Sequence, residues 1–153
     1  MNVFKSRRRL SRDNTKLVNV GFTEEQMNKM SMSFKNRSLA MSCLSKWIVE
    51  DLIKRNKTLD IEFKDGEYSF KERDFKKSTI NLISKDYTNE NLNKRNVVID
   101  KDTIDVVLNN SSKNSLYRLL PALTLYAIEK LYKENKVFMQ DNNKDINIYI
   151  KTN

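Results

Sequence analysis

The chain has 153 residues, of which 39% are apolar and 32% charged, and its formal net charge is +9. With no histidine, one cysteine and only two isolated glycines, it lacks the residues for a histidine-based catalytic site, a histidine- or cysteine-based zinc site, an intramolecular disulfide or a glycine-rich phosphate loop. We therefore expect no enzymatic activity, metal or cofactor, and the absence of a long apolar run and of a secretory signal predicts a cytoplasmic protein without membrane attachment.

Residues 1–15 predict a flexible basic arm, because they carry many cations and few apolar side chains. Residues 1–57 contain 13 Lys and Arg against 5 Asp and Glu, a net charge of +8, whereas the rest of the chain carries +1. This local excess is typical of a module that binds a polyanion, although charge alone does not separate DNA, RNA and a phospholipid surface, and a solubilising tail is the simpler alternative. The cations of the arm are Lys5, Arg7, Arg8, Arg9 and Arg12.

Residues 16–22 predict a β-strand, since apolar and other residues alternate there with a period of two. One face carries Val18, Val20 and Phe22, and the other carries Leu17, Asn19 and Gly21. The simpler reading of this run is an ordinary edge strand of one mixed sheet.

Two helices are expected after this strand. Thr23 and Gln26 have the spacing of a capping box, in which each side chain satisfies a backbone N–H of the first helical turn. They predict a helix that ends near residues 35–36. Ser38 then predicts the start of a second helix, which runs to about Lys54 and carries an apolar stripe.

The remaining residues predict a mixture of short strands and helices. Asp65-Gly66 is a two-residue turn between two alternating runs, which predicts a hairpin over residues 57–70. Residues 80–84 fit either a strand or part of a helix, and residues 86–96 predict a loop. Further along, the patterns predict a strand at 97–100, a helix over 103–110 capped by Asp102, a helix over 116–135 kinked or restarted at Pro121, and a closing strand at 146–150.

The sequence also contains a weak internal similarity. Residues 16–56 align with residues 95–135 without a gap, with Val18 on Val97 and Leu44 on Leu123. Both segments then predict a strand, a capped helix, a connector and a long helix. Only 7 of 41 positions are identical, which chance and shared composition explain adequately, so the sequence leaves open whether 95–135 is a second copy.

Residues 16–55 resemble the ribbon-helix-helix family of prokaryotic DNA-binding proteins. The resemblance covers about a quarter of the chain and rests on KLVNVGFTEEQ, on KNRS and on the stripe from Ala40 to Leu52. It implies that two copies pair their strands antiparallel in a two-stranded ribbon, which lies in the DNA major groove, while the helices form an intertwined dimer. Such a partner strand also solves a physical problem, because a lone short strand cannot satisfy its own backbone hydrogen bonds.

The resemblance places the base-contacting positions at Leu17, Asn19 and Gly21, with Lys16 beside them. Asn19 is the best base reader, since a carboxamide pairs bidentately with adenine, and Leu17 is suited to a thymine methyl group. Gly21 departs from the family, in which a larger polar or basic residue is usual. The phosphate-contacting residues that we expect are Arg7, Arg8, Arg9 and Arg12 of the arm, and Lys35, Arg37 and Ser38 at the start of the second helix.

We therefore expect an α+β protein in three parts: the arm (1–15), a ribbon-helix-helix domain (16–56) and a small mixed α/β domain (57–153) for oligomerisation or partner binding. The expected function is sequence-specific binding of double-stranded DNA by a homodimer. The resemblance implies a transcriptional repressor, or a plasmid accessory protein that marks a transfer origin or a centromere and recruits a relaxosome or motor protein. The alternatives are a non-enzymatic assembly factor with a basic tail and an RNA-binding protein, which would need exposed aromatic side chains near the basic region.

Overall fold

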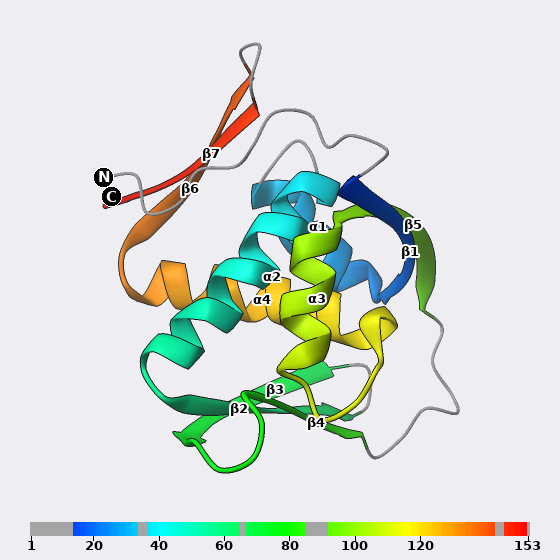
Figure 1. The fold of residues 1–153 in the computed structure, drawn as a ribbon. Helices are drawn as coiled ribbons and strands as arrows, with labels where there is room; N and C mark the ends of the chain where they lie inside the picture. The colour runs from blue at the N-terminus through cyan, green and yellow to red at the C-terminus, as the bar shows by residue number, and fades with distance from the viewer. Residues whose placement is uncertain (1–13, 34–36, 65–66, 85–91, 143–145, 153) are drawn as a thin grey trace.

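A computed structural model describes residues 14–33, 37–64, 67–84, 92–142 and 146–152 of the chain. These residues form an α+β fold in which the helices lie in the middle, one small sheet lies below them, a second lies along one side and a hairpin projects from the C-terminal end (Figure 1). The elements in chain order are β1 (Thr15–Phe22), α1 (Glu24–Ser33), α2 (Arg37–Lys54), β2 (Lys57–Lys64), β3 (Glu67–Asp74), β4 (Ile80–Ser84), β5 (Asn93–Asp100), α3 (Lys101–Asn109), α4 (Leu116–Lys133), β6 (Lys136–Asn142) and β7 (Ile146–Thr152).

The strand that pairs with β1 is not the one that the sequence led us to expect. β1 pairs antiparallel with β5 of the same chain, with Thr15 opposite Asp100 and Phe22 opposite Asn93, and not with the β1 strand of a second copy. Strand β5 occupies one of the two hydrogen-bonding edges of β1. The two-stranded β1–β5 ribbon therefore forms within one molecule, and the intertwined dimer through β1 is not the arrangement observed.

The start of α1 follows the expected capping box. The side chain of Gln26 accepts a hydrogen bond from the Thr23 backbone N–H at 2.9 Å, and the Thr23 hydroxyl accepts one from the Gln26 N–H at 3.2 Å. The cap of α3 differs from the expectation, because Asp100 and not Asp102 accepts the hydrogen bond, from the Asp102 N–H at 3.0 Å. Helix α3 consequently begins at Lys101, earlier than expected.

The second half of the chain follows the expected order with shifted boundaries. The hairpin is present as β2 and β3, and residues 80–84 form a strand, β4, that pairs parallel with β2. β5 extends back to Asn93, so the loop expected over 86–96 was wrong at residues 93–96. Pro121 lies inside α4, near its start, and the helix continues through it.

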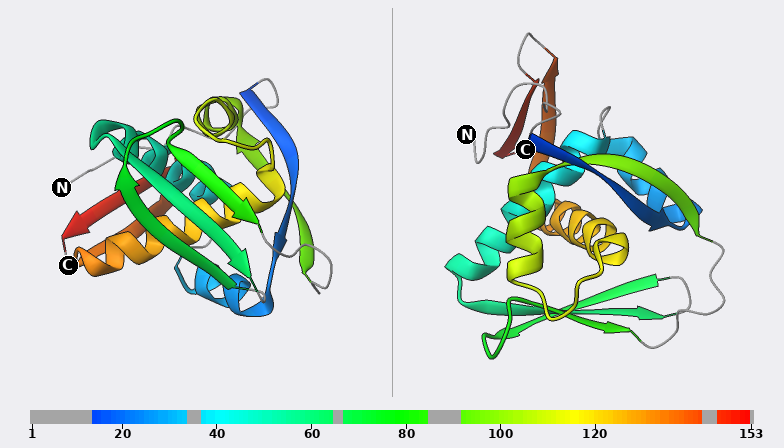
Figure 2. Two further views of the ribbon diagram at one scale, coloured as in Figure 1. Left: turned by 90° about the horizontal axis from the view of Figure 1, so that it is seen from below. Right: turned by 45° about the vertical axis from the view of Figure 1, so that its right-hand side comes forward.

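The chain contains two strand–helix–helix segments, β1–α1–α2 and β5–α3–α4, and the long helix of each packs on the strand of the other. Helix α2 follows β1 in the chain but packs on β5, and α4 follows β5 but packs on β1, while α2 and α4 pack on each other (Figures 1 and 2). At the contact between the two helices, the buried Ser45 and Thr124 hydroxyls lie 3.3 Å apart, within hydrogen-bonding distance. The two strand–helix–helix segments are therefore interlocked and cannot separate without exposing both.

The inner face of the ribbon belongs to a core that both segments share. Val20 and Phe22 of β1 are buried together with Ile99 of β5, and the same cluster contains Leu44 of α2 and Leu123 of α4. Contacts therefore cross the domain boundary that was expected at residue 56. Burial of these side chains holds the ribbon against the helices, while Leu17 and Asn19 of β1 and Asn96 and Val98 of β5 stay exposed on the opposite side.

Aromatic side chains attach the three-stranded sheet β3–β2–β4 to α4. The Phe63 and Tyr68 rings lie 4.7 Å apart, and the Tyr68 hydroxyl donates to the Arg118 carbonyl at 3.3 Å. The buried Arg118 guanidinium stacks over the Phe63 ring at 4.2 Å, a cation–π contact. This sheet supports the start of α4 from below (Figure 2).

The internal similarity of residues 16–56 and 95–135 is also present in the structure. Helix α2 spans 37–54 and α4 spans 116–133, so the two helices have the same length and follow the same alignment at both ends. Asn56 and Asn135, which follow these helices, both have positive φ angles, of 56° and 57°. A hairpin follows in each case, β2–β3 and β6–β7, and only β4 has no counterpart. The described chain is thus a structural repeat of strand, helix, helix and hairpin.

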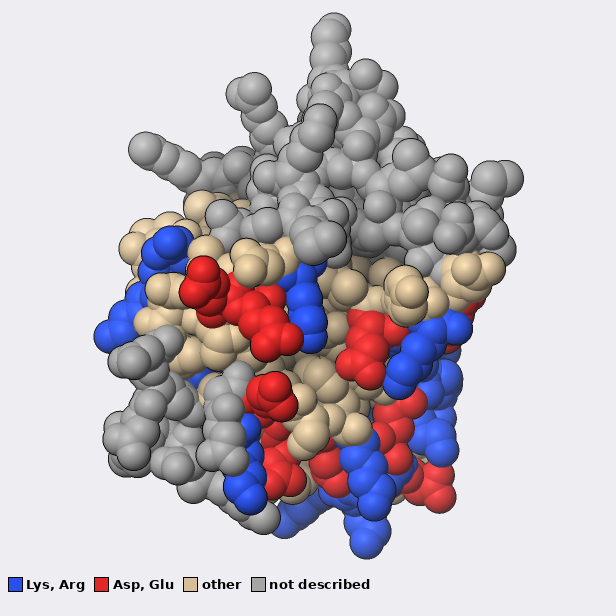
Figure 3. Space-filling model, turned by 180° about the vertical axis from the view of Figure 1, so that it is seen from behind, with Lys and Arg blue, Asp and Glu red and all other residues tan. Residues whose placement is uncertain are grey.

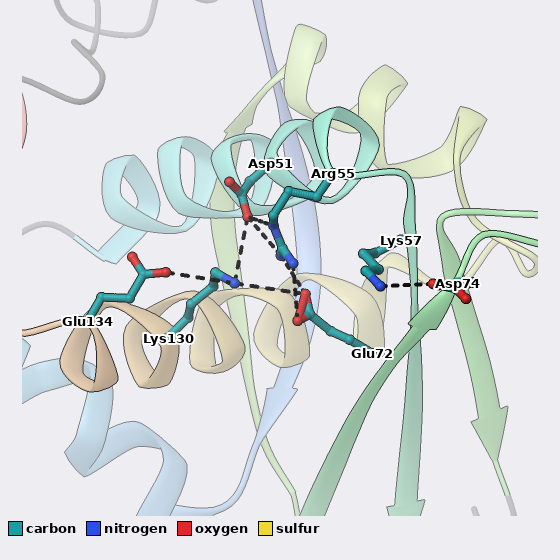
Figure 4. Close-up of polar contacts among 7 residues, drawn as sticks. All are labelled: Asp51, Arg55, Lys57, Glu72, Asp74, Lys130 and Glu134. Atoms are coloured by element: carbon teal, nitrogen blue, oxygen red, sulfur yellow. Dashed lines mark hydrogen bonds and ion pairs between the residues drawn. The ribbon is translucent and has the colours of Figure 1, made fainter.

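Charged side chains join the C-terminal ends of α2 and α4 to β3 (Figure 4). Arg55 donates to Asp51 at 2.9 Å and also to Glu72, and the Lys130 Nζ atom lies 3.8 Å from Asp51 and 3.9 Å from Glu72. All four side chains are a third exposed or less. The cluster therefore ties the crossing helices to the three-stranded sheet.

Acid should weaken this cluster through Glu72. Burial acts to raise the pKa of Glu72, but the hydrogen bond from Arg55 and the charge of Lys130 outweigh it and lower the pKa below the usual 4.5. Ionised Glu72 thus stabilises the fold above about pH 4.5, and this contribution disappears as the pH falls through the folded-state pKa. Glu72→Gln should lower the free energy of unfolding by about 1–2 kcal/mol at pH 7 and by less at pH 3, in urea titrations. Glu67→Gln, at an exposed position of the same strand, is the control, and an equal pH dependence for both variants would refute the assignment.

Candidate nucleic-acid interface

The outer face of the β1–β5 ribbon is formed by the residues that point away from the core. From β1 these are Leu17 and Asn19, and from β5 they are Lys94, Asn96 and Val98. All five are exposed, whereas Val18, Val20, Val97 and Ile99 on the inner face are buried. We refer to these five exposed residues as the outer ribbon face.

One half of the outer ribbon face is apolar. Leu17 lies opposite Val98, and their side chains are 62% and 37% exposed. Apolar side chains that stand exposed on a strand are unfavourable in water and often mark a binding surface when they gather. The pair is therefore available to an apolar feature of a ligand.

The other half of the outer ribbon face carries amides. Asn19 lies opposite Asn96, and the Asn19 Nδ2 atom donates a hydrogen bond to the Asn96 Oδ1 atom at 3.1 Å. This bond uses one of the two donors of Asn19 and orients both carboxamides, which keep further donors and acceptors for a ligand. Lys94 lies next on this face of β5, so a cation stands beside the amides.

Gly21 alternates onto the same side of β1 as Leu17 and Asn19, opposite Lys94, but it is buried. A Cβ atom at position 21 would lie 2.5 Å from the Cζ and Oη atoms of Tyr117, whose ring from the first turn of α4 covers the strand there. The absence of a side chain at position 21 thus has a packing reason.

Gly21→Ala should displace the Tyr117 ring, because contacts below 3.0 Å cannot be kept. We expect a loss of about 1–3 kcal/mol of stability, measured by thermal or urea unfolding. Tyr117→Ala in the same chain removes the clash, so the two changes together should cost less than their sum. Strict additivity of the two losses would show that the ring does not constrain position 21.

Ser38 lies at the start of α2, but its hydroxyl faces the ribbon. It accepts a hydrogen bond from the Val98 backbone N–H at 3.2 Å, and Ser42, one turn later, accepts one from the Asp100 N–H at 3.1 Å. The two serines satisfy the edge of β5 that points away from β1 and hold the ribbon in place. The expected role of Ser38 as a phosphate ligand stays a prediction.

Only some of the basic residues expected at the site lie among the described residues. Lys16 is exposed on β1, and the equivalent position on β5 is the exposed Arg95. Arg37 begins α2, but its side chain lies outside the described residues. Outside them altogether are Arg7, Arg8, Arg9 and Arg12 of the arm, and Lys35. The arm precedes Thr15 in the chain, so it is attached at the apolar end of the ribbon.

Neither the face of the molecule in Figure 3 nor a small pocket beside α2 and α3 offers a comparable site. On the face that Figure 3 shows, acidic and basic side chains are interspersed and no single sign gathers. A pocket of about 250 Å³ near the ends of α2 and α3 is lined by Ile53, Asn56, Phe75, Lys77, Ser78, Thr79, Asn109 and Asn110, and thus by neither a carboxylate nor a thiol. Among the described residues, no group of three acidic or thiol side chains could hold a metal ion, and no helix there is long and apolar enough to span a membrane.

Sequence reasoning missed the β5 half of the site. Asn96 and Lys94 fell in a segment expected to be a loop, and Val98 was expected in a strand without a partner. The signal that could have found them is the alignment of residues 16–56 with 95–135, which places Leu17 on Asn96 and Asn19 on Val98.

Comparison of the chain with protein-family models, with curated proteins and with solved structures found no match.

Proposed function

We propose that this protein binds double-stranded DNA by inserting the β1–β5 ribbon into the major groove. The observation that carries the proposal is the outer ribbon face, where the exposed pair Leu17 and Val98 adjoins the hydrogen-bonded pair Asn19 and Asn96. The major groove of B-DNA is about 12 Å wide and admits a two-stranded ribbon. Carboxamides read adenine there, and aliphatic side chains contact thymine methyl groups.

The order and packing of the elements support this proposal. Two strand–helix–helix segments pair their strands antiparallel and cross their helices, which is the arrangement that the ribbon-helix-helix family builds from two chains. We propose that this chain supplies both halves itself. The net charge of +8 in residues 1–57 supplies the attraction to phosphates that affinity for DNA requires.

In this proposal the protein is a cytoplasmic repressor or plasmid accessory protein. Several chains would assemble on repeated sites, and the elements outside the ribbon and its helices, namely the sheet β3–β2–β4 and the hairpin β6–β7, would contact a further copy or a protein partner. The RNA-binding alternative is less well supported, because the outer ribbon face carries no aromatic side chain for base stacking.

A nuclease footprint on the DNA that flanks the gene of this protein tests the proposal, with excess non-specific competitor. Protection of a discrete site, or of several repeats, is the expected result. The absence of protection at low salt, with a protein shown to be folded by circular dichroism, would overturn DNA recognition and favour a protein-binding role.

The basic arm should set the salt dependence of binding. Deletion of residues 1–12 removes the cations Lys5, Arg7, Arg8, Arg9 and Arg12. The slope of log affinity against log salt concentration should therefore become shallower by about 0.9 for each phosphate that is no longer neutralised. The slope is measured by fluorescence anisotropy with a labelled duplex between about 50 and 200 mM salt. An unchanged slope would mean that the arm does not contact DNA.

A further inference from the structure

The two segments of the chain are related by an approximate twofold axis that passes through the ribbon and through the helices. In a twofold arrangement, a residue on the axis contacts its own equivalent. Val18 pairs with Val97 in the ribbon, and Ser45 contacts Thr124 between α2 and α4; both pairs are equivalent positions of the two segments. Two separate contacts thus join equivalent residues, as a symmetric pair of subunits would.

The backbone follows the same relation beyond these two contacts. At the end of α2, the Arg55 N–H donates to the Asp51 carbonyl at 3.0 Å, and at the end of α4 the Glu134 N–H donates to the Lys130 carbonyl at 3.0 Å. Donors and acceptors of the two bonds are again equivalent positions of the two segments. The next residue of each segment, Asn56 and Asn135, also has a matching positive φ angle, so the two segments repeat the same backbone at these helix ends.

The outer ribbon face does not follow this symmetry. The position equivalent to Leu17 is Asn96, and the position equivalent to Asn19 is Val98. Because β1 and β5 run antiparallel, the two aliphatic residues fall on one side of the axis, and the two amides fall on the other. The framework is symmetric, but its two halves present different chemistry.

We infer that one chain reads one DNA site and that this site lacks twofold symmetry. The inference rests on the proposed binding of DNA by the ribbon. One half of the site would place thymine methyl groups against Leu17 and Val98, and the other would place adenine edges against Asn19 and Asn96. A ribbon of two identical strands would read an inverted repeat. The β1–β5 ribbon is not suited to an inverted repeat, because its two halves carry different side chains.

The test is a selection from a library of duplexes with about 14 randomised base pairs, somewhat more than one helical turn. The full chain is used, and native mass spectrometry of the complex with the shortest bound duplex gives the number of chains. We expect a motif without inverted symmetry and one chain per duplex. An enriched inverted repeat bound by two chains would overturn the inference while DNA binding stood, whereas no enrichment of any motif would overturn DNA binding itself.

A second variant tests the asymmetry directly. Leu17→Asn and Val98→Asn, made together, place asparagine at all four central positions of the outer ribbon face, and both positions are exposed enough to leave the core unchanged. The selected motif should then become an inverted repeat, and affinity for the original site should fall roughly tenfold for each base pair that no longer matches. Selection of the original motif by this variant would overturn the assignment of the two halves. Circular dichroism and thermal unfolding establish that the variant is folded.

Discussion

Replacement of Asn19 and Asn96 by alanine in one chain is expected to weaken binding to the specific duplex by about 100-fold. A bidentate contact between a carboxamide and a base contributes about 1–3 kcal/mol of discrimination, and the two amides form one hydrogen-bonded unit on the outer ribbon face. Binding to a non-specific duplex should change little, because neither substitution alters a charge. Competition titrations with the two duplexes at one salt concentration measure both affinities.

A matched control separates base reading from a general loss of surface polarity. Asn109→Ala removes the same group from an exposed position at the end of α3, where it lies beside Phe75 and Thr79 and outside the outer ribbon face. It should leave both affinities unchanged. Equal losses of specific and non-specific binding in the Asn19 and Asn96 variant would argue against base reading by these residues.

Phe22→Ala is expected to be the most destabilising single change in β1. Phe22 is 1% exposed and ends the inner face of the ribbon, so its removal leaves a cavity between the strand and the core. Truncation of a buried phenylalanine costs about 3–5 kcal/mol, which is a large part of the stability of a typical domain. Urea unfolding monitored by circular dichroism gives the difference in the free energy of unfolding.

Leu17→Ala on the same strand should have little effect on stability but should weaken DNA binding. Because Leu17 is 62% exposed, its truncation should change stability by less than about 0.5 kcal/mol while it weakens binding to the specific duplex. The two variants together test which face of β1 packs on the helices. A large loss of stability for Leu17→Ala, or a negligible one for Phe22→Ala, would reverse the assignment of the faces.

Local signals in the sequence predicted local structure well. The capping box depends only on Thr23 and Gln26, which are close together in the chain, and both of its hydrogen bonds are present. The alternation of Val18, Val20 and Phe22 likewise identified the buried face of β1, since a strand presents every second side chain to the same side.

The partner of β1 could not be predicted in the same way. A strand pattern states which face is buried but not which strand completes the hydrogen bonds. The segment that does so begins with Asn93, Lys94, Arg95 and Asn96, which are polar and typical of a loop, and only Val97 and Ile99 carry the buried side of β5. With 7 identical positions in 41, the repeat was too faint to identify β5 as the counterpart of β1.

The reason for a glycine at position 21 could not be predicted from the sequence either. Its small size is required by Tyr117, a residue far along the chain that covers the strand from α4. Sequence alone shows that position 21 lacks a side chain but not what occupies the space. The candidate base contacts therefore shift from Gly21 to Asn96 and Val98, on the strand that the sequence did not pair with β1.

Site-specific photo-cross-linking shows whether the outer ribbon face contacts DNA. A photoreactive amino acid replaces Leu17 in one variant and Tyr132 in another; Tyr132 is 85% exposed near the far end of α4. Each variant is irradiated with the same labelled duplex, and cross-linked DNA is measured on a denaturing gel. If the outer ribbon face lies in the groove, we expect efficient cross-linking from position 17 and none above background from position 132. Cross-linking from position 132 without any from position 17 would contradict it.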